Sequence, residues 1–283
     1  MKIIKLYTLA LVGIISLSAS PSSSQADFRQ WIQGQPGLVS FWDFQAENDN
    51  SFQAVGREKA GLLMANDKVS HEKGDGVFGD YSVKISEGGY MFIPREKLGK
   101  LNIHGKEAQV TVVAWMKRES EKYWQAIAGV WNESRSKRQY YLFMNARAAS
   151  DYRVLERFPC QNRIHGHISA LGGKTPGKKA WVSYASGGTD IKNDTWHMIG
   201  MTYDGQFIRV YLDGKLDSMQ YANPFPYEEG IFDGGGDGAD FTVGSNSVRN
   251  AMENYFVGKI GGLAVFESAL SEEVLSEMYK MSF

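Results

Sequence analysis

The chain has 283 residues, of which 43% are hydrophobic and 13% aromatic, so it is long and apolar enough to bury a large core. The 31 lysine and arginine residues nearly balance the 32 aspartate and glutamate residues, and the formal net charge at pH 7 is −1. We expect no nucleic-acid partner, because such a partner requires a concentrated basic surface. The single cysteine, Cys160, cannot form an internal disulfide, and we interpret it as a small buried hydrophobe rather than a nucleophile.

The first 26 residues have the pattern of a secretory signal peptide. Lys2 and Lys5 precede an apolar run over 6–17, and Ser24 and Ala26 are the small residues of a cleavage site. The apolar run is too short to cross a bilayer, although an N-terminal membrane anchor is the alternative interpretation. We therefore predict a secreted or periplasmic protein with no integral membrane segment after signal removal. Loss of the two lysines would change the formal net charge of −1 to −3.

After the signal, short alternating or apolar runs bounded by turn residues continue to the end of the chain. Asp204-Gly205 and Asp213-Gly214 are hairpin signals between such runs. Helical spacing occurs at 269–281, where Ser271 can cap the helix and acidic residues follow it. The predicted strands are 37–44, 81–86, 89–94, 109–118, 124–131, 139–146, 162–171, 180–185, 195–203, 206–214, 240–245 and 257–268. We expect one all-β domain over 27–283, a two-sheet jelly-roll sandwich with one short C-terminal helix.

Three segments resemble consecutive signatures of the laminin-G-like, concanavalin A-like lectin/glucanase superfamily. They are GKEAQVTVVAWMKRES (105–120), NDTWHMIGMTYDGQFIRVYLDGKLDS (193–218) and FVGKIGGLAVFESALSEEVLSEMY (256–279). The resemblance implies two sheets with one concave face, on which relatives bind or cleave carbohydrate. The chain departs from the closing signature at Gly261-Gly262, where relatives commonly have an acidic residue. Since this fold supports several functions, the function has to be argued from a site.

The candidate site begins with the strand that contains Arg163, His165 and His167. These residues alternate with Ile164 and Ile168, so one face of the strand is polar and the other apolar. We expect the polar face to line the concave groove. Aromatic and amide side chains on neighbouring strands suit a sugar, which has an apolar C–H face and hydroxyl edges. The predicted ligand-binding residues are Trp131, Tyr141, Asn145, Arg163, His165 and His167.

The same period-2 sorting extends the candidate face to other strands. In 111–117 it groups Thr111, Val113, Trp115 and Lys117, and in 139–145 it adds Phe143 to Tyr141. That Trp115 and Phe143 belong to the core instead is an open alternative.

Two function classes are compatible with this face, and a protein-adhesion module is a third. The first is carbohydrate binding, with acidic polysaccharides as one ligand class that the lysines of the 172–179 loop would favour. The second is a polysaccharide lyase with His165, His167, Arg163 and Tyr141 as its catalytic set. The carboxylate pair of a glycoside hydrolase does not occur on any predicted strand.

We expect no metal and no cofactor in the candidate site. His165 and His167 supply two ligands, whereas catalytic zinc usually has three protein ligands. The glycine-rich segment 232–240 contains Asp233, Asp237 and Asp240, which form either a structural loop or a calcium site.

Overall fold

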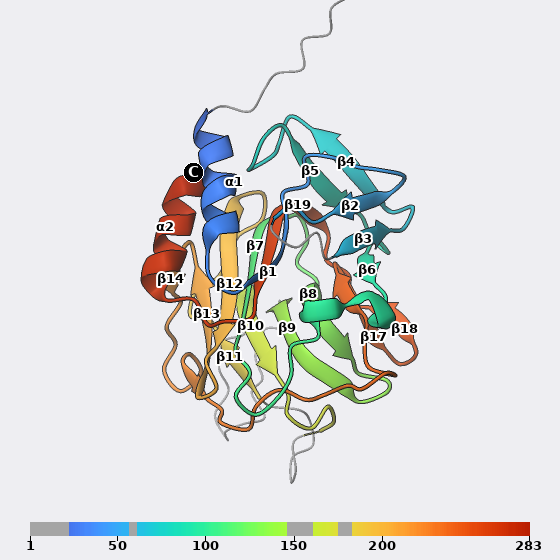
Figure 1. Cartoon of the computed structure of the whole chain (residues 1–283), viewed down its shortest axis with the longest axis vertical. Coiled ribbons are helices and arrows are strands. Elements are labelled where there is room, and N and C mark those ends of the chain that lie inside the picture. Colours follow the sequence, from blue (N-terminus) through green and yellow to red (C-terminus); the bar gives the residue numbers. More distant parts are fainter. Residues whose placement is uncertain (1–22, 57–60, 146–160, 175–182) are drawn as a thin grey trace, which may run out of the picture.

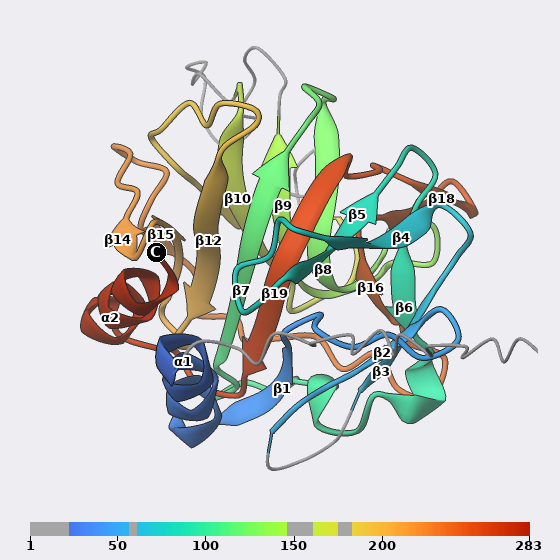
Figure 2. The same cartoon turned by 90° about the horizontal axis from the view of Figure 1, so that it is seen from above.

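The computed structural model describes residues 23–56, 61–145, 161–174 and 183–283. Two β-sheets pack face to face, and two helices lie side by side against one of them (Figures 1 and 2). The predicted two-sheet jelly-roll sandwich is therefore confirmed. Among the helices in the described ranges, none combines the length and apolar character that a membrane crossing requires.

The nine-stranded sheet contains three of the predicted signature segments at its centre. In spatial order its strands are β14 (Lys215–Leu216), β13 (Phe207–Leu212), β12 (Trp196–Tyr203), β7 (Val110–Arg118), β19 (Gly258–Phe266), β5 (Tyr81–Ile85) and β4 (Val69–Lys73). Two further strands extend it, β1 (Leu38–Trp42) on β19 and β15 (Phe225–Pro226) on β13. The hairpin signals are confirmed, because Asp204-Gly205 joins β12 to β13 and Asp213-Gly214 joins β13 to β14.

The ten-stranded sheet contains the strands of the candidate site. Its spatial order is β11 (Tyr184–Ser186), β10 (Arg163–Ile168), β9 (Lys137–Asn145), β8 (Trp124–Asn132), β16 (Phe241–Val243), β6 (Met91–Ile93), β3 (Leu62–Ala65) and β2 (Ser51–Gln53). The short strand β17 (Asn246–Val248) pairs with β8 and with β18 (Ala251–Glu253). Two 3₁₀ turns, η1 (Arg95–Lys97) and η2 (Gly99–Leu101), precede β7.

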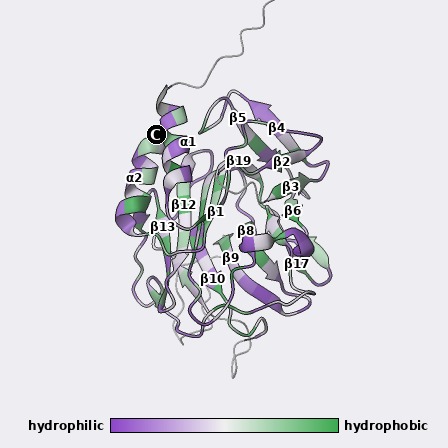
Figure 3. Cartoon of the chain, viewed as in Figure 1, coloured by the Kyte–Doolittle hydropathy of each residue, from purple (hydrophilic) through white to green (hydrophobic). Residues whose placement is uncertain are grey.

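The main core lies between the two sheets and follows from alternation along the strands. On β7 it takes Val112, Ala114 and Met116, and on β9 it takes Tyr140, Leu142 and Met144. Hydropathy colouring shows apolar stretches along the central strands and a hydrophilic stretch at the outlying β4 (Figure 3). The odd-numbered residues of β7 and β9 consequently point away from this core.

Helices α1 (Ser23–Gly34) and α2 (Glu272–Ser282) cover the outer face of the nine-stranded sheet. The second agrees with the predicted C-terminal helix, and Ser271 accepts a hydrogen bond from the backbone N–H of Val274 as its N-cap. The expectation of a single helix is wrong. Helix α1 has few apolar positions, and its first residues overlap the predicted signal peptide, so the sequence pattern does not predict it.

The odd-numbered residues of β7 decide the alternative that the sequence left open for Trp115, because they lie in a core and not on the candidate face. Val113 and Trp115 are buried beneath the two helices, where Trp115 contacts Phe28 of α1 and donates a hydrogen bond to Ser282 of α2 at 2.6 Å. They do not share a face with Tyr141, because β7 and β9 belong to different sheets. Period 2 shows which residues of one strand share a face, but it does not assign the strand to a sheet.

Candidate functional site

Strand β10 has the predicted phase. Ile164 and Ile168 are fully buried in the core between the sheets, and His165 and His167 lie on the opposite, outer face of the ten-stranded sheet. Gly166 sits between the histidines and faces the core, where an added Cβ would lie 2.9 Å from Val210 Cγ1 and 3.0 Å from Met201 Cβ. The backbone of β10 therefore lies directly against β12 and β13, which only glycine permits at this point.

The two imidazoles belong to a continuous aromatic cluster on the outer face. Both stack on Tyr184 of β11, with ring centroids 5.0 Å away in each case. Trp124 stands edge-on to both, at 5.4 Å from His165 and 5.9 Å from His167. His165 also shares a hydrogen bond of 3.1 Å with the hydroxyl of Ser186. The members of this cluster, which we call the outer aromatic face, are Trp124, Trp131, Tyr141, Phe143, His165, His167 and Tyr184.

Trp124 and Tyr184 were not among the predicted site residues. Trp124 and Trp131 are seven positions apart, and strict alternation would place them on opposite faces of β8. The pairing of β8 with β9 shifts register between Ala126 and Ala128, which adds one residue and reverses the phase. Both tryptophans therefore belong to one face. Tyr184 comes from a strand of three residues, too short for its phase to be read from the sequence.

Burial is the main difference between the predicted and the observed site. We expected the six residues to line an open groove, yet only Arg163 among them is partly exposed. The side chains of Trp131, Tyr141, Asn145, His165 and His167 have at most 5% of their surface exposed. Trp124, at the end of β8, is also partly exposed. The outer aromatic face therefore reaches solvent at Trp124, and Arg163 is partly exposed at the same end of the sheet.

Arg163 and Asn145 are directly opposite each other on β10 and β9, and Asn145 is in turn opposite Trp124. The guanidinium of Arg163 donates a hydrogen bond to the carbonyl oxygen of Gly188. The partly exposed end of the cluster thus combines an indole, a fixed cation and an amide. This end is where an incoming ligand can make contact without moving the buried rings.

The hydroxyl of Tyr141 is held by hydrogen bonds within the fold. Its hydroxyl lies 3.1 Å from the carbonyl oxygen of Thr242, 3.0 Å from Thr242 Oγ1 and 2.9 Å from the carbonyl oxygen of Ser245. Complete burial raises the pKa of Tyr141 far above its usual value. A phenol with such a pKa is a poor proton-transfer group at neutral pH, where a catalytic group needs a pKa near the working pH.

Replacing Tyr141 with phenylalanine should lower the free energy of unfolding by about 1–3 kcal/mol, because buried acceptors on Thr242 and Ser245 would lose a partner. Urea unfolding measures this loss. Tyr221→Phe is the matched control, since Tyr221 is 70% exposed and its hydroxyl can bond to water. Equal stability of the two variants would show that the Tyr141 hydroxyl contributes nothing.

The three aspartates of 232–240 contact protein cations or amides. Asp237 pairs with Lys137 at 2.8 Å, Asp240 accepts the backbone N–H of Arg95 at 2.8 Å, and Asp233 accepts the N–H of Gly235 at 2.9 Å. In the described part of the chain, no group of three or more His, Cys, Asp or Glu side chains is arranged to hold a metal ion. Cys160 and the lysines at 178 and 179 lie outside the described residues.

Comparison with known proteins identifies the family. The family model described as "Concanavalin A-like lectin/glucanases superfamily" matches residues 86–276. The chain belongs to this superfamily. A search of curated proteins gave no significant match to this superfamily member.

Several solved structures share the fold of this concanavalin A-like domain at low sequence identity. Domain 4 of AbnA, a GH43 extracellular arabinanase from Geobacillus stearothermophilus in complex with arabinotriose, matches with a TM-score of 0.53 and 15% identity, covering 86% of this chain and 98% of that one. The botulinum neurotoxin serotype G binding domain matches with a TM-score of 0.54 and 12% identity, covering 86% and 51%. A botulinum neurotoxin type C structure, whose description reports dependence of cell entry on two ganglioside molecules, matches with a TM-score of 0.52 and 10% identity, covering 87% and 52%. This chain spans about half the length of the neurotoxin structures.

Proposed function

We propose that this protein is a secreted or periplasmic carbohydrate-binding protein that engages a glycan at the exposed end of the outer aromatic face. The observation that carries the proposal is the partly exposed Trp124, which lies across Asn145 from the partly exposed Arg163 and contacts the buried rings of His165 and His167. An indole offers an apolar face for the C–H face of a sugar ring, and neighbouring polar groups can bond to its hydroxyls.

Two further facts support carbohydrate as the ligand class. Domain 4 of AbnA was solved with arabinotriose, and the type C neurotoxin structure is described in terms of gangliosides. Arg163 favours a glycan that carries carboxylate or sulfate groups, because a guanidinium pairs with such anions in a bidentate manner. Secretion rests on the signal-like pattern of residues 1–26.

A lyase is the weaker candidate for the same face. It would need His165, His167, Arg163 and Tyr141 to reach the substrate, and Tyr141 is held by its hydrogen bonds with a raised pKa. The histidines are also buried against Tyr184 and Trp124. Binding requires only the exposed end of the cluster and therefore fits the observed geometry better.

Trp124→Ala should weaken binding to the recognised polysaccharide by roughly 30-fold, since truncating an aromatic anchor costs about 2 kcal/mol. The measurement is titration against a panel of acidic and neutral polysaccharides, with release of unsaturated product followed by ultraviolet absorbance. Trp31→Ala is the matched control, because Trp31 is also a partly buried tryptophan but lies on α1, against the other sheet.

Unchanged affinity in Trp124→Ala, or an equal loss in Trp31→Ala, would contradict the proposed binding face. Unsaturated product formed by the wild-type protein and lost in His165→Ala would instead assign the lyase function.

A further inference from the structure

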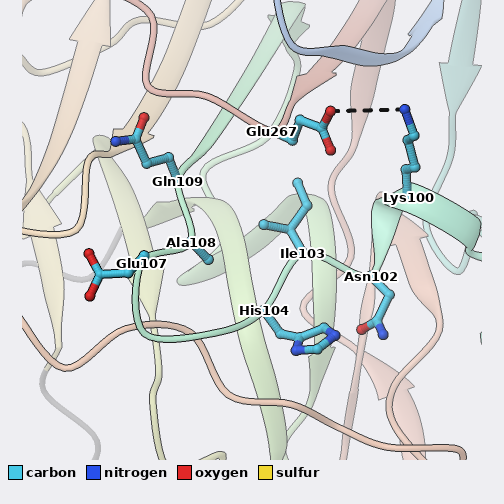
Figure 4. Close-up of a pocket in the computed structure, with 8 residues that line it drawn as sticks. All are labelled: Lys100, Asn102, Ile103, His104, Glu107, Ala108, Gln109 and Glu267. Carbon is cyan, nitrogen blue, oxygen red and sulfur yellow. Dashed lines mark ion pairs between the residues drawn. The ribbon is translucent and has the colours of Figure 1, made fainter.

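Figure 4 shows a polar hollow of about 410 Å³. It lies near Gln139, toward the opposite end of β9 from Asn145, which pairs with Trp124. It is formed by η2, by the segment between η2 and β7, and by Glu267 directly after β19. Its lining residues are Lys100, Asn102, Ile103, His104, Glu107, Ala108, Gln109 and Glu267. The volume falls within the range of small-molecule sites, and nothing in the outer aromatic face contributes to it.

A buried glutamine, Gln139, holds two residues of this lining, Asn102 and Ile103, in place. The pairing of β8 with β9 shifts register again between Val130 and Trp131, and Gln139 lies in the skipped position. Its side chain is fully buried, and Nε2 donates to Asn102 Oδ1 at 3.1 Å and to the carbonyl oxygen of Ile103 at 3.0 Å. Arg95 Nη1 donates to Gln139 Oε1 at 2.8 Å, which fixes the orientation of the amide.

The next residue of β9, Tyr140, also bonds to the segment that contains Asn102. Tyr140 donates its buried hydroxyl to the carbonyl oxygen of Leu101 at 2.7 Å. Two consecutive residues of one strand thus fix the backbone on both sides of Asn102. A site fixed in this way loses little conformational freedom on binding, which favours affinity for a small ligand.

The contact of Asn102 with Gln139 determines which group faces a ligand. Because Asn102 Oδ1 accepts the hydrogen bond from Gln139, its Nδ2 amide group, which has no partner among the described residues, is left as a donor. Glu267 lies across the hollow, 4.0 Å from Lys100, with its side chain half exposed (Figure 4). The hollow thus contains an amide donor and a carboxylate acceptor, and each can bind a hydroxyl group of a sugar.

The charges around the hollow disfavour an anion. The lining contains one lysine and two glutamates, Glu107 and Glu267, and His104 Nδ1 is 3.8 Å from Asp233 Oδ2. An acidic sugar would therefore meet more negative than positive charge here, in contrast to the exposed end of the outer aromatic face with Arg163.

We propose that this hollow is a second carbohydrate site that takes one neutral, monosaccharide-sized unit through its hydroxyl groups, with Asn102 as donor and Glu267 as acceptor. The site does not depend on the proposed function of the outer aromatic face. Gln139 and Asn145 are six residues apart on β9, so the two sites are separated by roughly 20 Å at about 3.3 Å per residue. A monosaccharide can occupy only one of them.

The test is titration of the full chain with glucose, galactose and arabinose, and with glucuronic acid as the anionic comparison. Asn102→Asp keeps an acceptor for Gln139 but replaces the free donor with a carboxylate oxygen, and it should weaken binding of the neutral sugars by roughly tenfold. Asn250→Asp adds the same charge at an exposed position outside the hollow and should leave binding unchanged.

Trp124→Ala should retain the neutral monosaccharide binding that Asn102→Asp loses, and this separates the two sites. The proposal is overturned if none of the three neutral sugars binds the wild-type protein, or if Asn102→Asp binds them as the wild type does. Preferential binding of glucuronic acid at Asn102 would also overturn it. None of these results bears on polysaccharide binding at Trp124.

Discussion

Replacing Trp115 with alanine should lower the free energy of unfolding by about 4 kcal/mol, within the range expected for truncating a buried tryptophan. The indole is fully buried, with ring centroids 4.8 Å from Phe78 and 6.0 Å from Phe28. Its Nε1 also donates to Ser282, so the variant loses a direct contact with α2. Urea unfolding followed by circular dichroism measures the loss.

Trp115→Phe is the control that separates packing from hydrogen bonding, because it fills much of the space but cannot donate to Ser282. It should cost less than alanine. Where the alanine variant remains folded, its polysaccharide affinity should equal that of the wild type, since Trp115 lies on the outer face of the other sheet. A loss of affinity without a loss of stability would show that Trp115 belongs to the binding face, and would contradict its position beneath the two helices.

Gly166→Val should lower the free energy of unfolding by about 3 kcal/mol, at the upper end of overpacking effects. The new Cβ would lie within about 3 Å of Val210 and Met201, and both belong to strands that cannot retreat without opening the core. Because His165 and His167 flank this residue, displacement of β10 should also disturb their stacking on Tyr184. Chemical denaturation gives the first effect and tyrosine and histidine NMR shifts give the second.

Gly236→Ala is the matched control for this substitution. Gly236 has no atom near the position of an added Cβ, and its backbone is outside the left-handed region. The alanine should therefore be neutral or slightly stabilising, through a smaller entropy of the unfolded chain. If Gly166→Val were as stable as Gly236→Ala, the two sheets would have to be able to separate at β10.

The phase of β10 could be predicted because Arg163, His165 and His167 alternate with isoleucines. The hairpins could be predicted because Asp-Gly favours tight turns: Asp213-Gly214 forms a two-residue turn, and Asp204-Gly205 begins the slightly longer connection between Tyr203 and Ile208. The α2 cap could be predicted from Ser271 and the acidic residues after it. These are local signals, and each is determined by residues a few positions apart.

The remaining features depend on contacts between distant segments. The register shifts between β8 and β9 bring Trp124 and Trp131 to one face and place Gln139 where it bonds to Asn102. Gly129 lies between the two shifts, but a glycine inside a strand does not by itself fix the size or direction of a bulge. The sheet to which Trp115 belongs depends on the pairing of β7 with β12 and β19. The burial of His165 and His167 could not be predicted either, because histidine occurs on solvent-exposed and on buried faces of sheets.

The positions of α1 and α2 have a practical consequence for measuring these interactions. Both helices cover the outer face of the nine-stranded sheet, and Phe283 follows α2 with 60% of its surface exposed (Figure 2). An affinity tag fused after Phe283 would therefore attach the protein to a sensor surface through the side that carries the helices. Trp124 would face the solution, and long polysaccharides could reach it without steric hindrance from the support.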